Sequence, residues 1–360
     1  MGQSLKRVGC LRNIQRQPQM NAIIMNRLFS MIIALISLIG CSCGNGNGTK
    51  AMTGAYSKAV KLSEDEKAIF SEVVAPYVDP ELKAEKVSRQ IVAGTNYCFV
   101  CKDPDGRKVE VVVYAPLPGA GEPLITSVNG VDLIDEFPGG SQIFITPSGK
   151  PLRVACIFHG SLAFEYDGKV IHIDPVTQMG QKKIDYSAFG KADAIFITHS
   201  HHDHLCPEAI QYLSGEETVL YANAESASSL GRGTVLANGE SGELSCGIKF
   251  TAVPAYNTTE GREMFHPKGN GNGYVLDFEG FRVYVAGDTE PIAEMSEFGV
   301  VDLAFLPVNQ PYTMTVKQCV DAAQLISPKI LIPYHYSDTD LCELPEMLKG
   351  MKVKILESLR

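Results

Sequence analysis

A cluster of histidines and an aspartate, THSHHDHL at 198–205, is the part of the chain best suited to chemistry. Imidazole and carboxylate groups are preferred ligands of Zn²⁺ and similar divalent metals. His199 and His201 can point the same way from an extended backbone. Asp203 and His204 follow where the chain turns, and they can face a second ion beside the first. The spacing predicts a two-metal site; an exposed histidine cluster with adventitious metal affinity is the alternative.

Three strand-like segments could position this site. The cluster directly follows the apolar run ADAIFIT at 192–198, at the strand end where α/β proteins usually place ligands. The run VYVAGDT leads to Asp288, and the run ILIPYH leads to His335. We therefore expect Asp288 and His335 to join the cluster.

From Pro151 to the end, the pattern is typical of a layered α/β protein. Strand runs such as RVACIFH and ADAIFITH precede helical segments such as CPEAIQYL and VKQCVDAAQLI. Together with His-x-His-x-Asp-His, the later Gly-Asp and the last histidine, residues 151–360 resemble the metallo-β-lactamase superfamily of metal-dependent hydrolases, which implies an αββα fold. The segments IFHGSLAFEYDGKVIHIDP, VPAYN, FHPKGNGNGY and AGDTE are most similar to the branch near ascorbate-6-phosphate lactonases and N-acyl-phosphatidylethanolamine phospholipase D.

The resemblance implies two divalent ions, with Zn as the first expectation and Mn or Fe as alternatives. His199 and His201 would bind the first ion, and Asp288 would bridge both. The second ion would be bound by three residues: Asp203, His204 and His335. Where the family usually has a histidine after the strand FTAVPA, this chain has Tyr256-Asn257, and the nearest candidate to complete the first site is His266.

The implied reaction is hydrolysis of a small molecule by a metal-bound hydroxide, with an ester, lactone, amide or phosphodiester as substrate. Asp203 would orient the hydroxide or accept its proton. A protein that carries or senses metal without turnover is a further alternative.

Other polar residues near the predicted strand ends are expected around the metals. Asp174 can orient a histidine of the cluster. His159 faces either the substrate pocket or the core, and His202, at the variable position of the motif, either contacts a ligand residue or is solvated. His172 lies within a strand and is expected to be packed.

The part of the chain before residue 136 predicts a separate module, because no histidine precedes His159 and the metal-binding pattern is confined to the later part. Residues 62–78 predict a helix with Ser63 as N-cap and Glu66 three residues later. Apolar strand-like runs separated by turns follow, so residues 51–135 predict an α+β module, one helix on an antiparallel sheet. Residues 136–150, rich in Pro, Gly and Ser, predict a linker to the hydrolase-like domain at 151–360.

This module resembles the stefin-type cystatins, inhibitors of papain-like cysteine proteases. The resemblance lies in QIVAG followed by TNY, in LPG at 117–119, and in an early glycine. In that family these pieces form a wedge that enters the protease cleft. The implied protease-binding residues are Gly54, Gln90, Ile91, Val92, Ala93, Gly94, Leu117 and Pro118. The alternative function is thus a cysteine-protease inhibitor with the hydrolase fold as scaffold, and a module that only spaces or docks the enzyme is a further possibility.

The N-terminal residues predict export. An apolar run at 28–39 follows Arg27, and LIGC at 38–41 resembles the lipobox of bacterial lipoproteins. We interpret 1–41 as leader and signal peptide, with translation starting at Met1, Met20 or Met25, and 42–50 as a flexible tether. The resemblance implies a lipid anchor at Cys41 in the bacterial cell envelope, either periplasmic or on the cell surface. A plain export signal or a buried helix are the alternatives.

The overall charge argues against nucleic acid as a partner. The formal net charge is −9 and the pI is about 5.4, so no general basic surface is available to neutralise phosphates.

Overall fold

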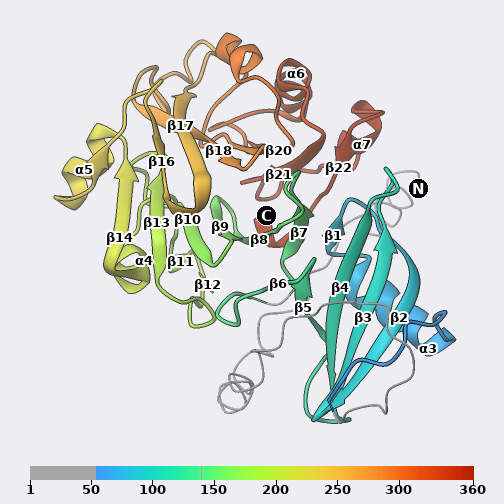
Figure 1. Cartoon of the computed structure of the whole chain (residues 1–360). Helices are drawn as coiled ribbons and strands as arrows, with labels where there is room; N and C mark the ends of the chain where they lie inside the picture. The colour runs from blue at the N-terminus through green and yellow to red at the C-terminus, as the bar shows by residue number, and fades with distance from the viewer. Residues whose placement is uncertain (1–53, 139) are drawn as a thin grey trace. The chain divides into compact units, whose positions relative to one another are not determined.

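The computed structural model describes residues 54–138 and 140–360, and the chain divides into two compact units between Arg153 and Val154 (Figure 1). The predicted signal peptide and tether lie outside the described residues. Within the described ranges, no helix is long and apolar enough to span a membrane.

The first unit begins with a short helix, α3 (Glu64–Ile69), which continues as a π-helical turn, η2 (Phe70–Val74). The Ser63 backbone N–H donates to the Glu66 carboxylate at 2.8 Å, and the Ser63 hydroxyl accepts from the Glu66 N–H. The helix is shorter than the predicted 62–78 because Pro76 has no N–H with which to continue it. Strand β1 (Val78–Asp79) follows and pairs in parallel with β7 (Gln142–Ile145).

An antiparallel sheet forms the rest of this unit. Its strands neighbour one another in chain order: β2 (Lys83–Val92), β3 (Gly94–Lys102), β4 (Lys108–Pro116), β5 (Leu124–Val128) and β6 (Val131–Asp132). Alternating apolar residues put Val87, Phe99 and Val111 side by side on one face, where they pack with Phe70 and Val74 of the helical segment. The arrangement is one helix on an antiparallel sheet.

The second unit contains two sheets covered by helices. The strands of its first sheet lie in the order β8 (Pro151–Phe158), β9 (Ser161–Tyr166), β10 (Lys169–Ile173), β13 (Ala192–Ile197), β14 (Ser214–Ala222) and β15 (Thr234–Val235). Those of the second lie in the order β16 (Ser241–Glu243), β17 (Ile248–Ala255), β18 (Gly271–Phe278), β19 (Phe281–Val285), β20 (Leu303–Pro307), β21 (Ile330–Tyr334) and β22 (Lys352–Val353). A small hairpin, β11 (Gln178–Met179) and β12 (Lys182–Lys183), stands apart from both.

The core of the second unit lies between its two sheets. The Phe196 ring of β13 lies 5.1 Å from the Phe250 ring of β17 and 5.0 Å from the Tyr274 ring of β18. Four helices lie at the sheets: α4 (Pro207–Leu213) and α5 (Ala224–Leu230) at the first, α6 (Val316–Ile326) and α7 (Leu344–Met347) at the second (Figure 1). Short 3-10 turns are η3 (Ser245–Gly247), η4 (Ala293–Glu297) and η5 (Glu357–Leu359). This is the αββα arrangement expected for 151–360.

The parallel strand pairs determine where the predicted metal-site residues lie. In the first sheet β10 pairs in parallel with β13, and in the second β19, β20 and β21 are parallel neighbours. The carboxyl ends of parallel neighbours meet at one edge of a sheet. Asp174 follows β10 and His199 follows β13, so the first sheet brings these two side chains to one edge. His335 follows β21, at the carboxyl edge of the second sheet.

Candidate metal centre

The first group of possible metal ligands is formed by three histidines and an aspartate: His199, His201, His266 and Asp288, each offering one atom within 4.8 Å of the others. His199 Nε2 lies 3.0 Å from His201 Nδ1 and 3.9 Å from Asp288 Oδ2. His266 Nε2 lies 3.2 Å from the same carboxylate oxygen. Residues predicted from two strand ends and one loop therefore meet at one point.

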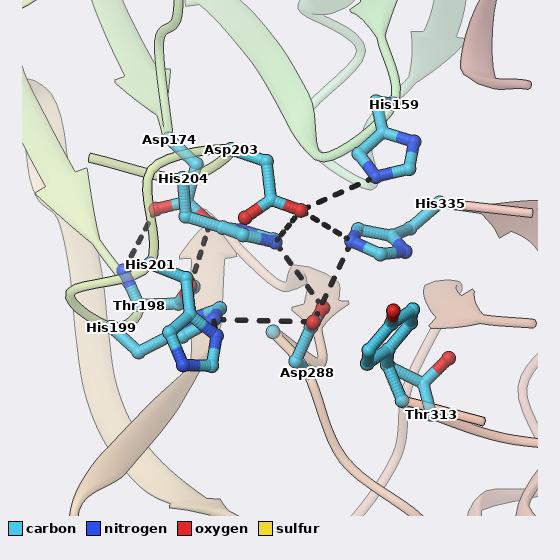
Figure 2. Close-up of polar contacts among 12 residues, drawn as sticks. His159, Asp174, Thr198, His199, His201, Asp203, His204, Asp288, Thr313 and His335 are labelled. Carbon is cyan, nitrogen blue, oxygen red and sulfur yellow. Dashed lines mark hydrogen bonds and ion pairs between the residues drawn. The ribbon is translucent and has the colours of Figure 1, made fainter. Parts of the chain in front are cut away.

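A second group lies beside the first and shares Asp288 with it (Figure 2). His204 Nε2 lies 3.3 Å from Asp288 Oδ1, and His335 Nε2 lies 3.5 Å from Asp288 Oδ2. His335 Nε2 also lies 3.5 Å from Asp203 Oδ2. Because Asp288 belongs to both groups, it stands where a bridging carboxylate would.

The donor atoms fit a divalent ion. Nε2 of His204, His266 and His335 and Oδ1 of Asp288 are all buried and have no hydrogen-bond partner within the protein. Burying such atoms unpaired is costly. Coordination of a metal would satisfy all of them, and mixed imidazole and carboxylate donors suit Zn²⁺ and its neighbours.

The protonation states also favour bound cations. Burial and the charge of His204 lower the pKa of His199 well below its usual range, and burial lowers that of His201, so both are neutral and can bind metal. Burial opposes ionisation of Asp288, but His335 and His204 outweigh it and lower the Asp288 pKa well below normal. Burial also opposes the charged form of His204, yet Asp288 and Asp174 raise its pKa well above normal. This position therefore favours positive charge.

Asp174 fixes the orientation of His204. Its carboxylate is fully buried, accepts hydrogen bonds from the Thr198 N–H at 2.8 Å and the Thr198 hydroxyl at 2.6 Å, and lies 2.7 Å from His204 Nδ1. A proton on Nδ1 that is donated to Asp174 leaves Nε2 free to face Asp288.

The other predicted histidines differ in their surroundings, and His159 joins Asp203 and His335 in a third group of possible metal ligands. His159 is buried, with Nε2 3.7 Å from Asp203 Oδ2 and its ring centroid 3.6 Å from that of His335. Burial lowers the His159 pKa to about 4, so the ring is neutral. The side chain of His202 is 96% exposed, with Nδ1 4.0 Å from Asp203 Oδ1, and it belongs to none of these groups. His172 is packed against the Tyr186 and Phe189 rings, inside the core.

Left-handed backbone follows three strands at the site. His159, Asp174 and His335 have φ angles of 51°, 45° and 50° directly after or next to the ends of β8, β10 and β21. Non-glycine residues in this conformation are costly and concentrate at functional sites. Nothing in the sequence signals these conformations, because the favoured residue for them is glycine.

His266 reaches the site because the loop between β17 and β18 folds back on itself. The Asn257 N–H donates to the His266 carbonyl at 2.9 Å. The Asn257 side chain donates to the Tyr312 carbonyl at 2.7 Å, which also lies 3.1 Å from His266 Nδ1. The histidine side chain thus stands beside Asn257, directly after β17, where the resemblance placed a histidine.

Glu290 holds this loop and was not singled out from the sequence. Its buried carboxylate accepts hydrogen bonds from the N–H groups of Thr258 at 2.8 Å and Thr259 at 2.6 Å, and it lies 3.1 Å from the Arg262 guanidinium. Burial opposes ionisation, but these donors lower the Glu290 pKa. The only indication of this role in the sequence is that Glu290 stands two residues after the predicted ligand Asp288.

Comparison with known proteins agrees with this geometry. The model of the β-lactamase superfamily domain matches residues 153–335. The chain therefore belongs to this superfamily of metal-dependent hydrolases. Its fold is the one predicted for 151–360.

Within the superfamily, its relatives include UPF0173 metal-dependent hydrolases. That of Thermococcus onnurineus is 32% identical over 50% of this chain and 83% of the relative, and that of Bacillus mycoides is 32% identical over 58% and 97%. A crystal structure from Parabacteroides distasonis, described as a metal-dependent hydrolase, is 51% identical with a TM-score of 0.58, covering 60% of this chain and 97% of that one. Igni18, a metallo hydrolase from Ignicoccus hospitalis, is 26% identical with a TM-score of 0.50, over 58% and 96%.

Proposed function

We propose that the chain hydrolyses a small molecule with two divalent ions, most simply Zn and alternatively Mn or Fe. His199, His201 and His266 would hold the first ion. Asp203, His204 and His335 would hold the second, and Asp288 would bridge them. The observation that carries the proposal is the sharing of one buried carboxylate by two groups of histidines, in which Nε2 of His204, His266 and His335 is buried without a hydrogen-bond partner. The reaction class is cleavage of an ester, lactone, amide or phosphodiester.

The protein contributes orientation and a protected site. When bound, two such ions lower the pKa of coordinated water towards neutrality and polarise the oxygen of the scissile group. The side chain of Asp203 is 20% exposed, and its Oδ2 faces His335 and His159. Although burial opposes it, these histidines lower the Asp203 pKa far below normal, so the carboxylate is ionised and can accept a hydrogen bond from the attacking water.

Metal content tests this proposal. Protein beginning after residue 50, purified without chelator, should contain about two equivalents of metal per chain, and Asp288→Asn should lose both metal and hydrolysis of an ester and phosphodiester panel. His202→Ala is the matched control, because its exposed side chain stands in the same motif but is not among the possible metal ligands. Wild-type protein without metal, even after reconstitution, would contradict the assignment.

We further propose, as a second function, that the first unit inhibits a papain-like cysteine protease through the stefin-type wedge. The exposure of two apolar side chains supports this proposal. Ile91 is 71% exposed and Leu117 is 58% exposed. They lie at the same end of the sheet, because Gly94 at the β2–β3 turn pairs with Pro116, where β4 ends. The Gln90 side chain donates to the Gly54 carbonyl at 2.6 Å, which brings the N-terminal segment to this end. Exposed apolar side chains gathered at one end support a binding role.

Inhibition of papain tests the wedge. Ile91→Ser should weaken inhibition about tenfold or more, while Val60→Ser, which removes an exposed apolar residue from the same unit, should not change it. Equal effects of both variants, or no inhibition by the wild-type chain, would leave this module without an inhibitory role.

The lipid anchor is also our proposal, since Cys41 lies outside the described residues. In a bacterial host the full chain should partition into detergent, Cys41→Ser should release it to the aqueous phase, and Cys43→Ser should behave as wild type. A Cys41→Ser variant that stays in the detergent phase would exclude lipidation at this cysteine.

A further inference from the structure

A cavity of about 260 Å³ opens beside the first group of histidines. His199, His201 and His266 form part of its wall. The rest comes from Ser200, from the first turn of α5, from the loop 264–267 and from the start of β18. A molecule that reaches the first metal position from this side must fit this cavity.

The charged side chain in the cavity wall is a carboxylate. The lining residues, all within the described part of the chain, include Glu225 and no lysine or arginine. The Asn270 amide donates to Glu225 at 2.6 Å and, with Ser200, lowers the Glu225 pKa, so this side chain is negative at neutral pH. This charge disfavours a phosphate group in contact with Glu225.

The cations on the neighbouring loop are already paired with other groups. Lys268 Nζ lies 3.0 Å from Glu294 and 3.0 Å from the Tyr256 hydroxyl. The Arg262 guanidinium contacts Glu290 at 3.1 Å and donates to Gln310 at 2.7 Å. Lys268 or Arg262 could bind a phosphodiester only after these contacts were broken, and neither residue lines the cavity.

Another part of the cavity wall is apolar. Met264 is 78% exposed beside the site, and Phe265 and Pro267 flank His266. The Phe265 ring is held edge-on against the Tyr312 ring at 5.2 Å. A flexible thioether next to a fixed ring and a proline is a surface on which an apolar part of a ligand can pack.

We propose that the substrate is a neutral or positively charged carboxylic acid derivative, an ester, lactone or amide, rather than a phosphodiester. Its apolar part packs on Met264, Phe265 and Pro267, and a hydrogen-bond donor or cationic group faces Glu225. The oxygen of water forms a bond to the acyl carbon, and the acyl C–O or C–N bond breaks. One proton goes to the leaving oxygen or nitrogen, and the other is released from the carboxylic acid. The proposal rests on the two-metal hydrolase function.

Paired substrates test the class. The metal-loaded chain should hydrolyse 4-nitrophenyl butyrate with at least about tenfold higher kcat/KM than bis(4-nitrophenyl) phosphate, each corrected for its metal-only rate. Higher kcat/KM on the phosphodiester would overturn the proposal. Bound metal without hydrolysis of either compound would also contradict it, because an activated ester is the most reactive member of the class. Absence of metal would instead refute the hydrolase function itself.

Charge reversal tests the role of Glu225. Glu225→Lys should raise KM for the cationic ester butyrylcholine by about threefold to tenfold, as expected for exposed charges, and lower KM for the phosphodiester. Glu263→Lys makes the same charge change at an exposed residue outside the cavity wall and should do neither. Equal effects of the two variants would mean that only the overall surface charge matters, which would contradict the role assigned to Glu225.

A Met264→Ser variant tests the apolar part of the cavity wall. It should raise KM for 4-nitrophenyl hexanoate more than KM for 4-nitrophenyl acetate. An equal change in KM for both esters would contradict apolar packing of the substrate on Met264.

Discussion

Replacement of Glu290 by glutamine should loosen the first metal position and spare the second. The carboxylate accepts two backbone hydrogen bonds, at 2.8 Å and 2.6 Å, and pairs with Arg262. Hydrogen bonds to charged groups contribute about 1.5–3 kcal/mol each, and breaking a fully buried ion pair costs about 3–5 kcal/mol. Arg262 is 19% exposed and keeps Gln310 and Thr259 as acceptors. We therefore expect a loss of about 2 kcal/mol, carried by the loop that holds His266.

Two kcal/mol corresponds to an affinity loss of about thirtyfold, within the range of about 10-fold to 100-fold known for residues that orient metal ligands. Competition with a chromogenic chelator would resolve two binding steps in the wild type. Glu290→Gln should weaken one step and leave the other, as His266→Ala should, while the exposed Glu260→Gln controls for charge on the same loop. A variant that melts earlier but binds both metals with wild-type affinity would refute the reasoning, because Glu290 would then only stabilise the fold.

The remaining predictions concern Asp174, His172 and Gly94. Asp174→Asn should weaken the second metal step about 10-fold to 100-fold in the same titration, since His204 loses its fixed orientation; unchanged binding would exclude this role. Burial lowers the His172 pKa from 6.5 to about 3, so the unfolded chain binds the extra proton between these values and stability falls as the pH drops from 6.5. His172→Leu should reduce the pH dependence of urea unfolding by at most about 1.4 kcal/mol per pH unit, and an unchanged slope would contradict the buried, neutral ring. Gly94→Ala should lower the melting temperature of residues 54–153, because at φ 135° its Cβ would lie 2.5 Å from the Ala115 carbonyl oxygen; Gly106→Ala, with open space around its Cβ, should cost less.

The part of the site that could be predicted from the sequence follows strand ends. His199 comes just after the buried parallel strand β13 of the first sheet, and His335 directly after the buried parallel strand β21 of the second, so each lies at the carboxyl edge of its own sheet. His266 could be named only as the nearest histidine, because its position depends on a loop that closes through contacts with Tyr312 and Glu290. Such contacts join residues more than 30 positions apart, and no local periodicity encodes them.

The same distinction holds for the fold. The capped start of α3 at Ser63 was readable from its capping box, but the end of the helix was set by Pro76 and by pairing of Val78 with Ile143. The cavity beside His201 was not predicted, since Glu225 and Met264 come from separate elements that meet only in the folded chain.

The loop between β17 and β18 has a consequence for how this protein can change. One segment supplies His266 to the metal centre and Met264, Phe265 and Pro267 to the cavity wall. On the proposed function, a mutation in this loop should therefore change metal affinity and substrate choice together. Exchanging this loop between relatives should transfer both properties, provided that the exchanged loop keeps residues that can bind Glu290, as Thr258 and Thr259 do here.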